Sequence, residues 1–313
     1  MPHTALTPPL PQVLTTLRDW IRHAASKLAA SDVHYGHGTS SPLDEAAALV
    51  LGLLNLPFDL HHDYFSAVLL PEERERLHHA LHRRIHERMP VPYLTGRTLY
   101  GGYEFQVDER VLIPRSPIAE LIEKRLAPWW PEEREPARIL DLCTGSGCIG
   151  IVAALTCPEA EVVLADIDDD ALDVAMLNVE AYGLENDIIL VQGDGLSAVD
   201  DLADGGFDWI LCNPPYVEAA EMDSIAAEFL HEPRHALVSG EDGLDFTRRL
   251  LHEAADYLGE DGILVLEVGM SWPLLEAAYP QVAFDWAELE RGGEGVLVIS
   301  RDELLAWRDT GVF

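Results

Sequence analysis

The segment Asn213-Pro214-Pro215-Tyr216 has side chains and a backbone suited to chemistry on nitrogen. It follows the apolar run 207–212, which is typical of a buried strand. Two consecutive prolines fix the backbone and remove two N–H donors, so the Asn213 side-chain oxygen and the Pro214 carbonyl can both accept hydrogen bonds from one NH2 group. Tyr216 offers a ring face to the planar group that carries this NH2. The segment favours methylation of a planar amide or amino nitrogen, which depends on orientation and electrostatics and requires neither a metal nor a strong base.

A second candidate site is the loop 144–147, which lies between the strand-like run 138–143 and a helical pattern. Its glycines let the backbone approach a nucleotide-like ligand, which would face the N-terminus of the helix. The stretch 145–150 also satisfies GxGxxG, which on its own fits a dinucleotide-dependent oxidoreductase. Asp166, at the end of the next strand, is placed to accept hydrogen bonds from ribose hydroxyls. That role occurs in NAD-dependent and adenosylmethionine-dependent enzymes alike.

These loops need a scaffold that brings the ends of several strands to one edge. Strand-like runs alternate with helical patterns from residue 138 onward, at 138–143, 161–166, 188–192, 207–212 and 263–268. This order predicts an α/β fold with a doubly wound, Rossmann-like parallel sheet that binds ligands at the carboxyl ends of its strands. The last two runs, 282–289 and 295–300, are joined by a short turn through Gly292-Gly293. We expect them to form an antiparallel pair at the C-terminal edge.

The first part of the chain has a different pattern. Apolar residues recur at helical spacing over 13–30, 43–54 and 72–88, which predicts a small helical domain at residues 1–91. Aromatic and β-branched residues around Gly101-Gly102 predict a β-hairpin within a linker at residues 92–113. Residues 114–313 then form the catalytic domain.

Histidine and cysteine are the residues most often used to bind metals. Ten of the 13 histidines lie in the first 90 residues. A metal site would need converging ligands with supporting groups, so we expect a solvated or partner-facing helix surface and no metal site. The four cysteines form no CxxC pair, so we expect small buried thiols without disulfides.

The charge is strongly negative and unevenly distributed. The net charge is −34, and residues 1–97 carry 9 Lys+Arg and 10 Asp+Glu, which leaves 12 and 45 for residues 98–313. Such a chain would repel a phosphate backbone, so we expect no direct DNA partner. The acidity either adapts the surface to a saline cytoplasm or steers a basic protein partner, and the two are compatible.

The chain has a mean hydropathy of +0.02 and lacks a run of about 18 apolar residues. The first residues have neither the basic region nor the apolar stretch of a signal peptide. We therefore expect a cytoplasmic protein without a membrane partner. The sequence does not specify an oligomeric state.

Together these motifs resemble a known family. The set Asp-Leu-Cys-Thr-Gly-Ser-Gly at 141–147, Asp166, Gly-Asp-Gly at 193–195 and Asn-Pro-Pro-Tyr at 213–216 resembles the class I S-adenosylmethionine methyltransferases that modify exocyclic or amide nitrogens. Further stretches narrow the resemblance, namely Tyr-Leu-Thr-Gly at 93–96, Val-Leu-Ile-Pro-Arg at 111–115, His-Glu-Pro-Arg-His at 231–235, Gly-Glu-Asp-Gly-Leu at 240–244 and Glu-Val-Gly at 267–269. From the hairpin to the C-terminus the chain is similar to the protein-(glutamine-N5) methyltransferases of the HemK/Prm type. A departure from the wider family is Cys143, which replaces the first glycine of the loop.

This resemblance implies roles for individual residues. The cofactor S-adenosyl-L-methionine would contact the loop 144–147 and the residues that follow the strand-like runs 161–166 and 188–192 or end them. These residues are Thr144, Gly145, Ser146, Gly147, Asp166, Asp194 and Gly195. Asn213, Pro214, Pro215 and Tyr216 would hold the substrate glutamine, with Asn213 also near the transferred methyl group. Arg115 and Glu120 would shape the substrate entrance, or would form a surface salt bridge.

Within the family, the chain is most similar to the branch that methylates large-subunit ribosomal protein L three. It has Ser116-Pro-Ile-Ala-Glu120 where the release-factor branch usually has Pro-Glu-Thr-Glu, and Cys143 and Cys148 where that branch has small residues. We therefore expect N5-methylation of a glutamine in that ribosomal protein, received through the helical domain.

Four alternatives are compared with this expectation. A methylase of release factors differs only in its target. A DNA adenine methyltransferase shares Asn-Pro-Pro-Tyr but would need a basic surface. A non-catalytic ribosome-assembly factor would tolerate damaged motifs, yet these are intact, and an NAD-dependent dehydrogenase gives no reason for residues 213–216.

Overall fold

The computed structural model describes residues 9–312, which divide into two compact units. Within the described residues, the first unit comprises 9–98, 107–109 and 226–231, and the second comprises 99–106, 110–225 and 232–312. The segment 226–231 belongs with the N-terminal helices although more than 100 residues separate it from them in the sequence, and no pattern in the sequence indicates this.

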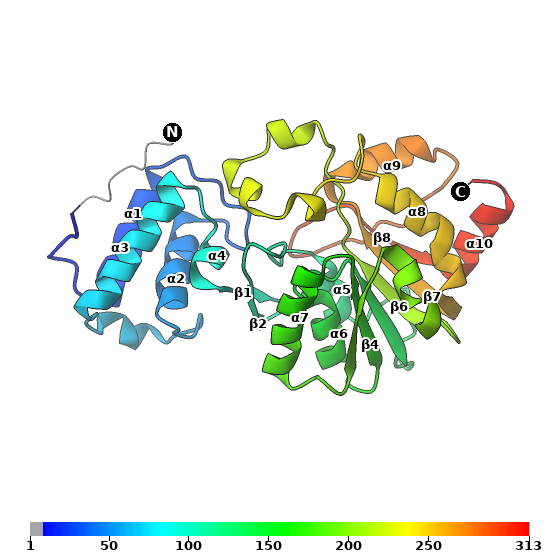
Figure 1. Cartoon of the computed structure of the whole chain (residues 1–313), viewed down its shortest axis with the longest axis horizontal. Coiled ribbons are helices and arrows are strands. Elements are labelled where there is room, and N and C mark those ends of the chain that lie inside the picture. The colour runs from blue at the N-terminus through cyan, green and yellow to red at the C-terminus, as the bar shows by residue number, and fades with distance from the viewer. Residues whose placement is uncertain (1–8, 313) are drawn as a thin grey trace. The chain divides into compact units, whose positions relative to one another are not determined.

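The first unit is helical (Figure 1). Its helices are α1 (Leu17–Ala29), α2 (Pro42–Leu53), α3 (Pro71–His86) and α4 (Val91–Thr95). The helices expected at 13–30, 43–54 and 72–88 are thus confirmed as α1, α2 and α3. Local chemistry fixes their starts: Thr16 and Asp19 form a reciprocal capping box on α1, and a proline occupies the first turn of α2 and of α3.

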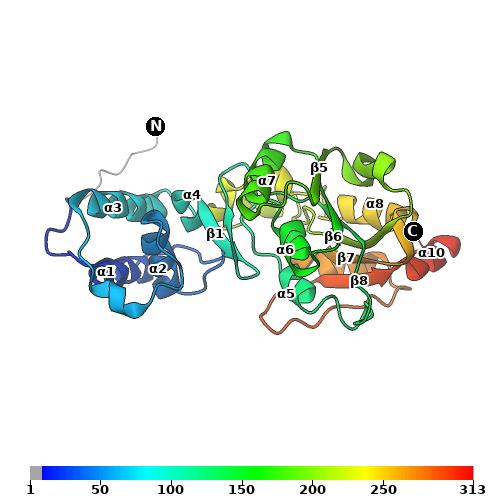
Figure 2. The same cartoon turned by 90° about the horizontal axis from the view of Figure 1, so that it is seen from below.

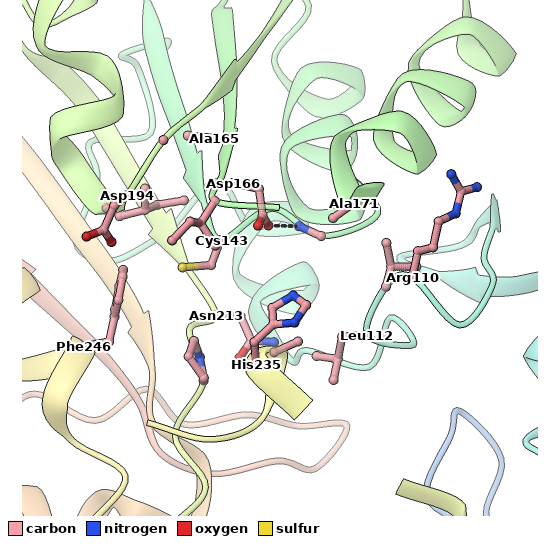
Figure 3. A pocket seen from close by; sticks show the side chains of 18 residues that line it. Arg110, Leu112, Cys143, Ala165, Asp166, Ala171, Asp194, Asn213, His235 and Phe246 are labelled. Atoms are coloured by element: carbon pink, nitrogen blue, oxygen red, sulfur yellow. Dashed lines mark hydrogen bonds between the residues drawn. The ribbon is translucent and has the colours of Figure 1, made fainter. Parts of the chain in front are cut away.

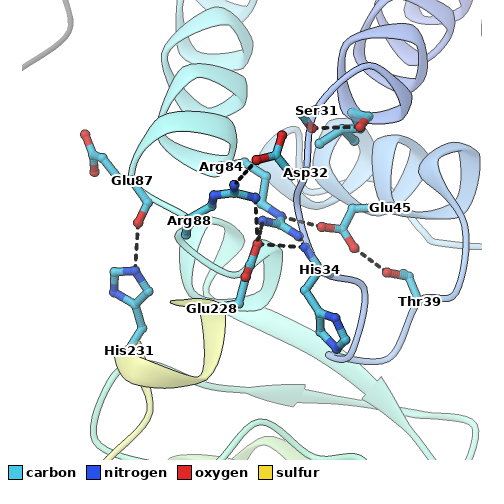
Figure 4. A network of polar contacts seen from close by, with 11 residues as sticks. Ser31, Asp32, His34, Thr39, Glu45, Arg84, Glu87, Arg88, Glu228 and His231 are labelled. Atoms are coloured by element: carbon cyan, nitrogen blue, oxygen red, sulfur yellow. Dashed lines mark hydrogen bonds and ion pairs between the residues drawn. The ribbon is translucent and has the colours of Figure 1, made fainter. Parts of the chain in front are cut away.

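A buried arginine joins several segments of this unit (Figure 4). Arg84 of α3 is 1% exposed, and its guanidinium contacts the carboxylates of Glu45 and Glu228. Its Nη2 donates to the His34 carbonyl at 2.6 Å. Near it, the His231 ring and the Glu87 carbonyl are hydrogen-bonded at 2.8 Å. The segment 226–231 is therefore held to the helices by buried charge as well as by packing.

The two strands of the hairpin are β1 (Arg97–Tyr100) and β2 (Tyr103–Gln106), which form a two-stranded sheet. Gly101 and Gly102 both have positive φ, 56° and 82°, as a two-residue turn between twisted strands requires. The hairpin begins at Arg97 because residues 91–95 form α4, which ends at Gly96 in the left-handed conformation.

The second unit is built around a six-stranded sheet with the order β5-β4-β3-β6-β7-β8. Its strands are β3 (Arg138–Leu142), β4 (Glu161–Asp166), β5 (Ile188–Gln192), β6 (Phe207–Cys212), β7 (Leu258–Glu267) and β8 (Val296–Ser300). The first five pair in parallel and β8 is antiparallel to β7. The five runs predicted to form the parallel part of the sheet, at 138–143, 161–166, 188–192, 207–212 and 263–268, each overlap a strand of this sheet.

Helices cover both faces of the sheet (Figure 2). Alternate residues of one strand point to opposite faces, so Ile139 packs with one layer and Leu140 with the other. One layer contains α5 (Ile118–Glu123), α6 (Cys148–Thr156) and α7 (Asp169–Tyr182). The opposite layer contains α8 (Asp245–Glu253), α9 (Trp272–Ala278) and α10 (Arg301–Asp309). This is the predicted doubly wound α/β arrangement.

The antiparallel edge pair exists, but one of its partners differs from the expected one. Ile263 to Glu267 of β7 pair with Val296 to Ser300 of β8. The run 282–289 forms no strand and touches β8 through the isolated bridge between Trp286 and Leu297. Its apolar residues instead pack on the helices, since Phe284 contacts the rings of Tyr279 and Trp307.

Two further sequence expectations concern cysteines and membranes. All four cysteines are free thiols; Cys148, Cys157 and Cys212 are buried, and Cys143 is partly exposed. In residues 9–312, no helix combines the length and the apolar character that crossing a bilayer demands.

Candidate active site

The carboxyl ends of β3, β4 and β6 surround a cavity of about 250 Å³ (Figure 3). Parallel strands bring their following loops to one edge, so motifs that are about 20 to 70 residues apart in the sequence meet there. Predicted residues from all of these loops line the cavity, namely Gly145, Asp166, Asp194, Gly195, Asn213 and Pro215. In the view of Figure 3, Asp194 and Phe246 lie on the left, and Leu112 and Arg110 on the right.

Asp166 ends β4 and contributes its carboxylate to the cavity. One oxygen accepts a hydrogen bond from the Gly145 N–H at 2.8 Å, and the other accepts from the Asp168 N–H at 3.0 Å. Burial raises the pKa of Asp166, and these two N–H donors oppose the rise. Because each oxygen has one backbone partner, each retains lone-pair capacity for a further donor, such as a hydroxyl of a ligand.

The rest of the glycine loop lies behind the cavity wall. Gly145 and Gly147 have φ of 54° and 80°, values that suit glycine, and Gly147 is the N-cap of α6. Thr144 and Ser146 are buried, with exposed fractions of 4% and 2%. Neither residue lines the cavity.

Thr144 and α6 hold a buried carboxyl group. The Thr144 hydroxyl and the Gly150 N–H, the latter at 2.8 Å, both donate to Oδ2 of Asp141 in β3. The other oxygen, Oδ1, is buried and has no hydrogen-bond partner among the described residues. Burial raises the pKa of Asp141 to about 7 despite the two donors, because the ionised form is poorly solvated there.

Asp194 lies at the end of the cavity near Phe246 (Figure 3), and the next residue, Gly195, also lines the cavity. The Asp194 carboxylate forms a bidentate ion pair with Arg249 of α8, with one contact at 2.7 Å. This pairing lowers the pKa of Asp194. A Cβ at Gly195 would come within 2.9 Å of the Arg249 guanidinium, so the glycine permits this close approach. The side chain of Asp194 is thus already paired, while Gly195 and the Phe246 ring face the cavity.

Asn213 follows β6 directly and lines the cavity with Pro215. Its side-chain oxygen Oδ1 is buried and has no hydrogen-bond partner in the part of the chain that the structure describes. A buried acceptor without a partner costs about 1–3 kcal/mol. Because the Asn213 residue lines the cavity, a ligand N–H that reaches this oxygen would offset that cost.

Tyr216 does not line the same cavity, and neither does Pro214. The Tyr216 hydroxyl donates to Glu267 Oε1 at 3.0 Å, at the end of the neighbouring strand β7. Burial raises the pKa of the Tyr216 hydroxyl well above its usual range, and the Glu267 charge raises it further. The phenol therefore stays protonated at physiological pH.

Arg115 and Glu120 lie outside the cavity wall. Arg115 forms a bidentate ion pair with Glu232, with one contact at 3.0 Å. Glu120 of α5 pairs with Lys124 at 2.9 Å and accepts from the backbone of Glu290 and Arg291, which lowers its pKa to about 2. Glu120 thus forms the salt bridge that the sequence left as an alternative to a place at the substrate entrance.

Sequence reasoning missed part of the cavity wall. Cys143, His235, Ala236 and Phe246 all face the cavity. His235 Nε2 lies 3.0 Å from an oxygen of Asp168, the N-cap residue of α7. Two signals were present in the sequence: His235 belongs to the family-like stretch 231–235, and Phe246 follows the stretch 240–244 by two residues.

The arrangement favours binding and orientation over base catalysis. The carboxylates at the cavity are held by backbone donors or by arginine, and Asn213 offers an uncharged acceptor. The one triad of described side chains spaced to hold a metal ion is His61, His62 and Asp63, which is exposed and belongs to the first unit.

Comparisons with known proteins identify relatives along nearly the whole chain. Residues 126–244 match the methyltransferase small domain. The chain is 45% identical over 293 residues to the ribosomal protein uL3 glutamine methyltransferase of Bordetella pertussis, covering 94% of this chain and 97% of that protein. It is 44% identical to the protein of the same name from Neisseria meningitidis serogroup A, covering 94% and 96%. A methyltransferase structure from Pyrococcus furiosus aligns with 64% of this chain and 89% of its own, at 18% identity and a TM-score of 0.45. The chain belongs to the family of the ribosomal protein uL3 glutamine methyltransferases.

Proposed function

We propose that this protein transfers a methyl group from S-adenosyl-L-methionine to the side-chain amide nitrogen of a glutamine in ribosomal protein uL3, the large-subunit protein L three. The observation that carries the proposal is the Asn213 side chain, which lines the same cavity as Asp166 and whose buried oxygen has no hydrogen-bond partner among the described residues. The names of the relatives at 44–45% identity support the choice of uL3 over release factors.

The cavity suits an adenosine-containing cofactor. Asp166 would accept hydrogen bonds from the two ribose hydroxyls, since each of its oxygens has one backbone donor and spare lone pairs. Gly195 and the Phe246 ring would contact the adenine, and the loop 144–147 would hold the methionine part at the start of α6. The bound cofactor supplies an electrophilic methyl group on a positively charged sulfur.

The chain's own residues orient the substrate amide. Asn213 Oδ1 and the Pro214 carbonyl would accept the two amide hydrogens, which turns the nitrogen lone pair toward the methyl carbon. The reaction would form one bond, from the amide nitrogen to the methyl carbon, at the expense of the carbon–sulfur bond, and one amide proton would leave to water. This direct displacement needs correct placement more than a strong base.

The first unit is proposed to dock the substrate protein. Residues 1–97 have a net charge of −1, against −33 for the rest of the chain, so a basic protein meets two very different surfaces. A hollow of about 530 Å³ on this unit is lined by residues of α1 and α2 and by Phe65, with Arg22 and the exposed Leu43 among them. Docking there predicts that Leu43→Asp raises the KM for uL3 without changing kcat, whereas Val13→Asp, another exposed position outside the hollow, leaves both unchanged.

The activity is tested by mass spectrometry of purified uL3, and of release factors in parallel, after incubation with the enzyme and S-adenosylmethionine. The expected result is a gain of one methyl group, about 14 Da, on a glutamine of uL3 alone. The variant Asn213→Ala should abolish this gain, and the matched control Asn186→Ala, at an exposed loop position, should retain it.

Each other outcome has a definite meaning. A gain on release factors alone would overturn the choice of target and keep the chemistry. A gain on neither protein would overturn the activity and favour a binding role in ribosome assembly. A calorimetric titration that shows tight binding of NAD instead of S-adenosylmethionine would overturn the assignment of the cofactor.

A further inference from the structure

A buried carboxylate fixes the tyrosine of the Asn-Pro-Pro-Tyr segment. β6 and β7 are parallel neighbours with Cys212 opposite Leu266, so Asn213 and Glu267 leave the sheet side by side at its carboxyl edge. The Tyr216 hydroxyl donates to Glu267 Oε1 at 3.0 Å. On the other side, the Ser116 hydroxyl donates to Glu267 Oε2 at 2.6 Å.

The remaining contacts of Tyr216 leave it little freedom. Ser271 Oγ donates to the Tyr216 carbonyl at 2.8 Å. A Cβ at Gly269 would lie 2.7 Å from ring atom Cε2, so the ring packs directly on the Gly269 backbone. A Cβ at Gly243 would lie 2.2 Å from the Tyr216 carbonyl oxygen. The end of β7, the adjoining segment Gly269–Ser271 and the loop at Gly243 thus fix the backbone, the ring plane and the hydroxyl of one side chain.

A buried carboxylate at position 267 carries a desolvation cost that packing alone does not require. The side chain is 5% exposed, and burial raises its pKa although the Ser116 and Tyr216 hydroxyls stabilise the ionised form. The charge of Arg115 also lowers that pKa, but the guanidinium of Arg115 forms its bidentate ion pair with Glu232. A hydrophobic side chain of similar volume would fill the space without the desolvation cost.

We infer that Glu267 is a positioning residue for methyl transfer, which acts through Tyr216 by fixing the ring against which the substrate amide lies. This inference rests on the proposed function. It also assigns the Tyr216 hydroxyl to Glu267 and not to the substrate, so the tyrosine contributes its ring face and no proton. Ser116 completes the arrangement because it holds the second carboxylate oxygen.

The test measures kcat and KM for both substrates, with purified uL3 and S-adenosylmethionine, in the full-length variants Glu267→Leu, Glu267→Gln, Tyr216→Phe and the double variant E267L/Y216F. A ring that is no longer fixed loses the near-attack geometry, so Glu267→Leu should lower kcat roughly 10- to 100-fold, while the dissociation constant of the cofactor changes less than about threefold. Glu267→Gln should restore most of kcat, because its amide oxygen accepts from Tyr216 and its NH2 donates to Ser116.

The double variant separates positioning from general damage. If Glu267 acts through the Tyr216 hydroxyl, Tyr216→Phe alone lowers kcat by a similar factor and E267L/Y216F is no worse than either single variant. Multiplicative losses in the double variant, or a kcat in Tyr216→Phe equal to that of the wild type, would overturn the inference.

A variant that does not fold and a wild-type enzyme without activity lead to different conclusions. If Glu267→Leu does not fold, Glu267→Gln and Tyr216→Phe still decide the question, since a low kcat in the first with a normal kcat in the second contradicts the inference. If the wild-type enzyme methylates no glutamine, the proposed function fails. Methylation by the wild type with independent variant effects refutes the positioning role alone.

Discussion

The buried carboxyl of Asp141 should make the stability of the second unit depend on pH in one identifiable way. Asp141 is fully buried in β3, one oxygen accepts from the Thr144 hydroxyl and the Gly150 N–H, and the other has no partner in the described residues. Asparagine in its place keeps an oxygen for both donors and presents an NH2 where a protonated carboxyl would present its O–H. Asp141→Asn therefore mimics the protonated form and removes the titration.

The size of the effect follows from the shift in pKa. Burial raises the pKa of Asp141 from 3.8 to about 7, so the folded state prefers the neutral form. The free energy of unfolding that this preference contributes is complete at a pH below the pKa of Asp141 in the unfolded chain. It is lost as the pH rises through the pKa of Asp141 in the folded protein. Between pH 5 and pH 8 the wild type should lose about 3 kcal/mol of unfolding free energy through this group.

The assay is urea unfolding at pH 5, 6, 7 and 8, followed by tryptophan fluorescence, for the wild type, Asp141→Asn and the control Asp204→Asn. Asp204 is exposed in a loop of the second unit, so its replacement reports the general effect of removing one negative charge. Subtracting each variant from the wild type cancels the titration of the other acidic groups. The stability of Asp141→Asn relative to the wild type should rise by about 3 kcal/mol from pH 5 to pH 8, and a difference that stays constant within about 0.5 kcal/mol would refute the reasoning.

Three further predictions address the helical unit, the glycine loop and the charge. Arg84→Met should destabilise the protein by about 3–5 kcal/mol in urea unfolding, because it leaves Glu45 buried without the Arg84 guanidinium and leaves Glu228 only the longer contact with Arg88 at 3.5 Å; a loss below about 1 kcal/mol would contradict the buried ion pair. Gly150→Ala should cost about 1–3 kcal/mol, because its Cβ would lie 2.2 Å from a methyl carbon of Leu164, and an unchanged melting temperature would show that the contact relaxes freely. Molar KCl should raise the melting temperature, because screening reduces the self-repulsion of a net charge of −34, and no rise would favour steering of a basic partner as the reason for the acidity.

The sequence predicted the second unit well because its signals are local. Each motif comes directly after an apolar strand, and the rule that parallel strands end at one edge then places Gly145, Asp166 and Asn213 at one cavity. The order of the strands within the sheet does not have to be known for this prediction. Helix and strand periodicity similarly located α1, α2, α3 and the parallel strands.

The errors came from contacts between segments that are far apart in the sequence. The segment 226–231 joins the helical unit through Glu228, whose partner Arg84 lies 144 residues earlier. The run 282–289 has strand-like residues, yet the edge of β7 is taken by β8, and the aromatic residues of this run pack on helices instead. Strand propensity and hydrophobic periodicity describe one segment at a time. They do not identify which of two segments pairs with the edge strand of a sheet.

Asn213 shows why the chemistry could be inferred before the geometry was known. Two prolines cannot donate hydrogen bonds, so a segment that contains them presents acceptors wherever it lies, and the end of a buried strand gives those acceptors few partners. Folding then leaves the Asn213 oxygen buried without a hydrogen-bond partner among the described residues, at a cost of about 1–3 kcal/mol that a hydrogen-bond donor of a ligand would offset. A glutamine amide offers that donor, whereas a glutamate carboxylate would set one acceptor against another. In the proposed function, selection for an amide over an acid would therefore follow from the acceptors of this segment, and the contacts on Tyr216 would determine how the accepted amide is oriented.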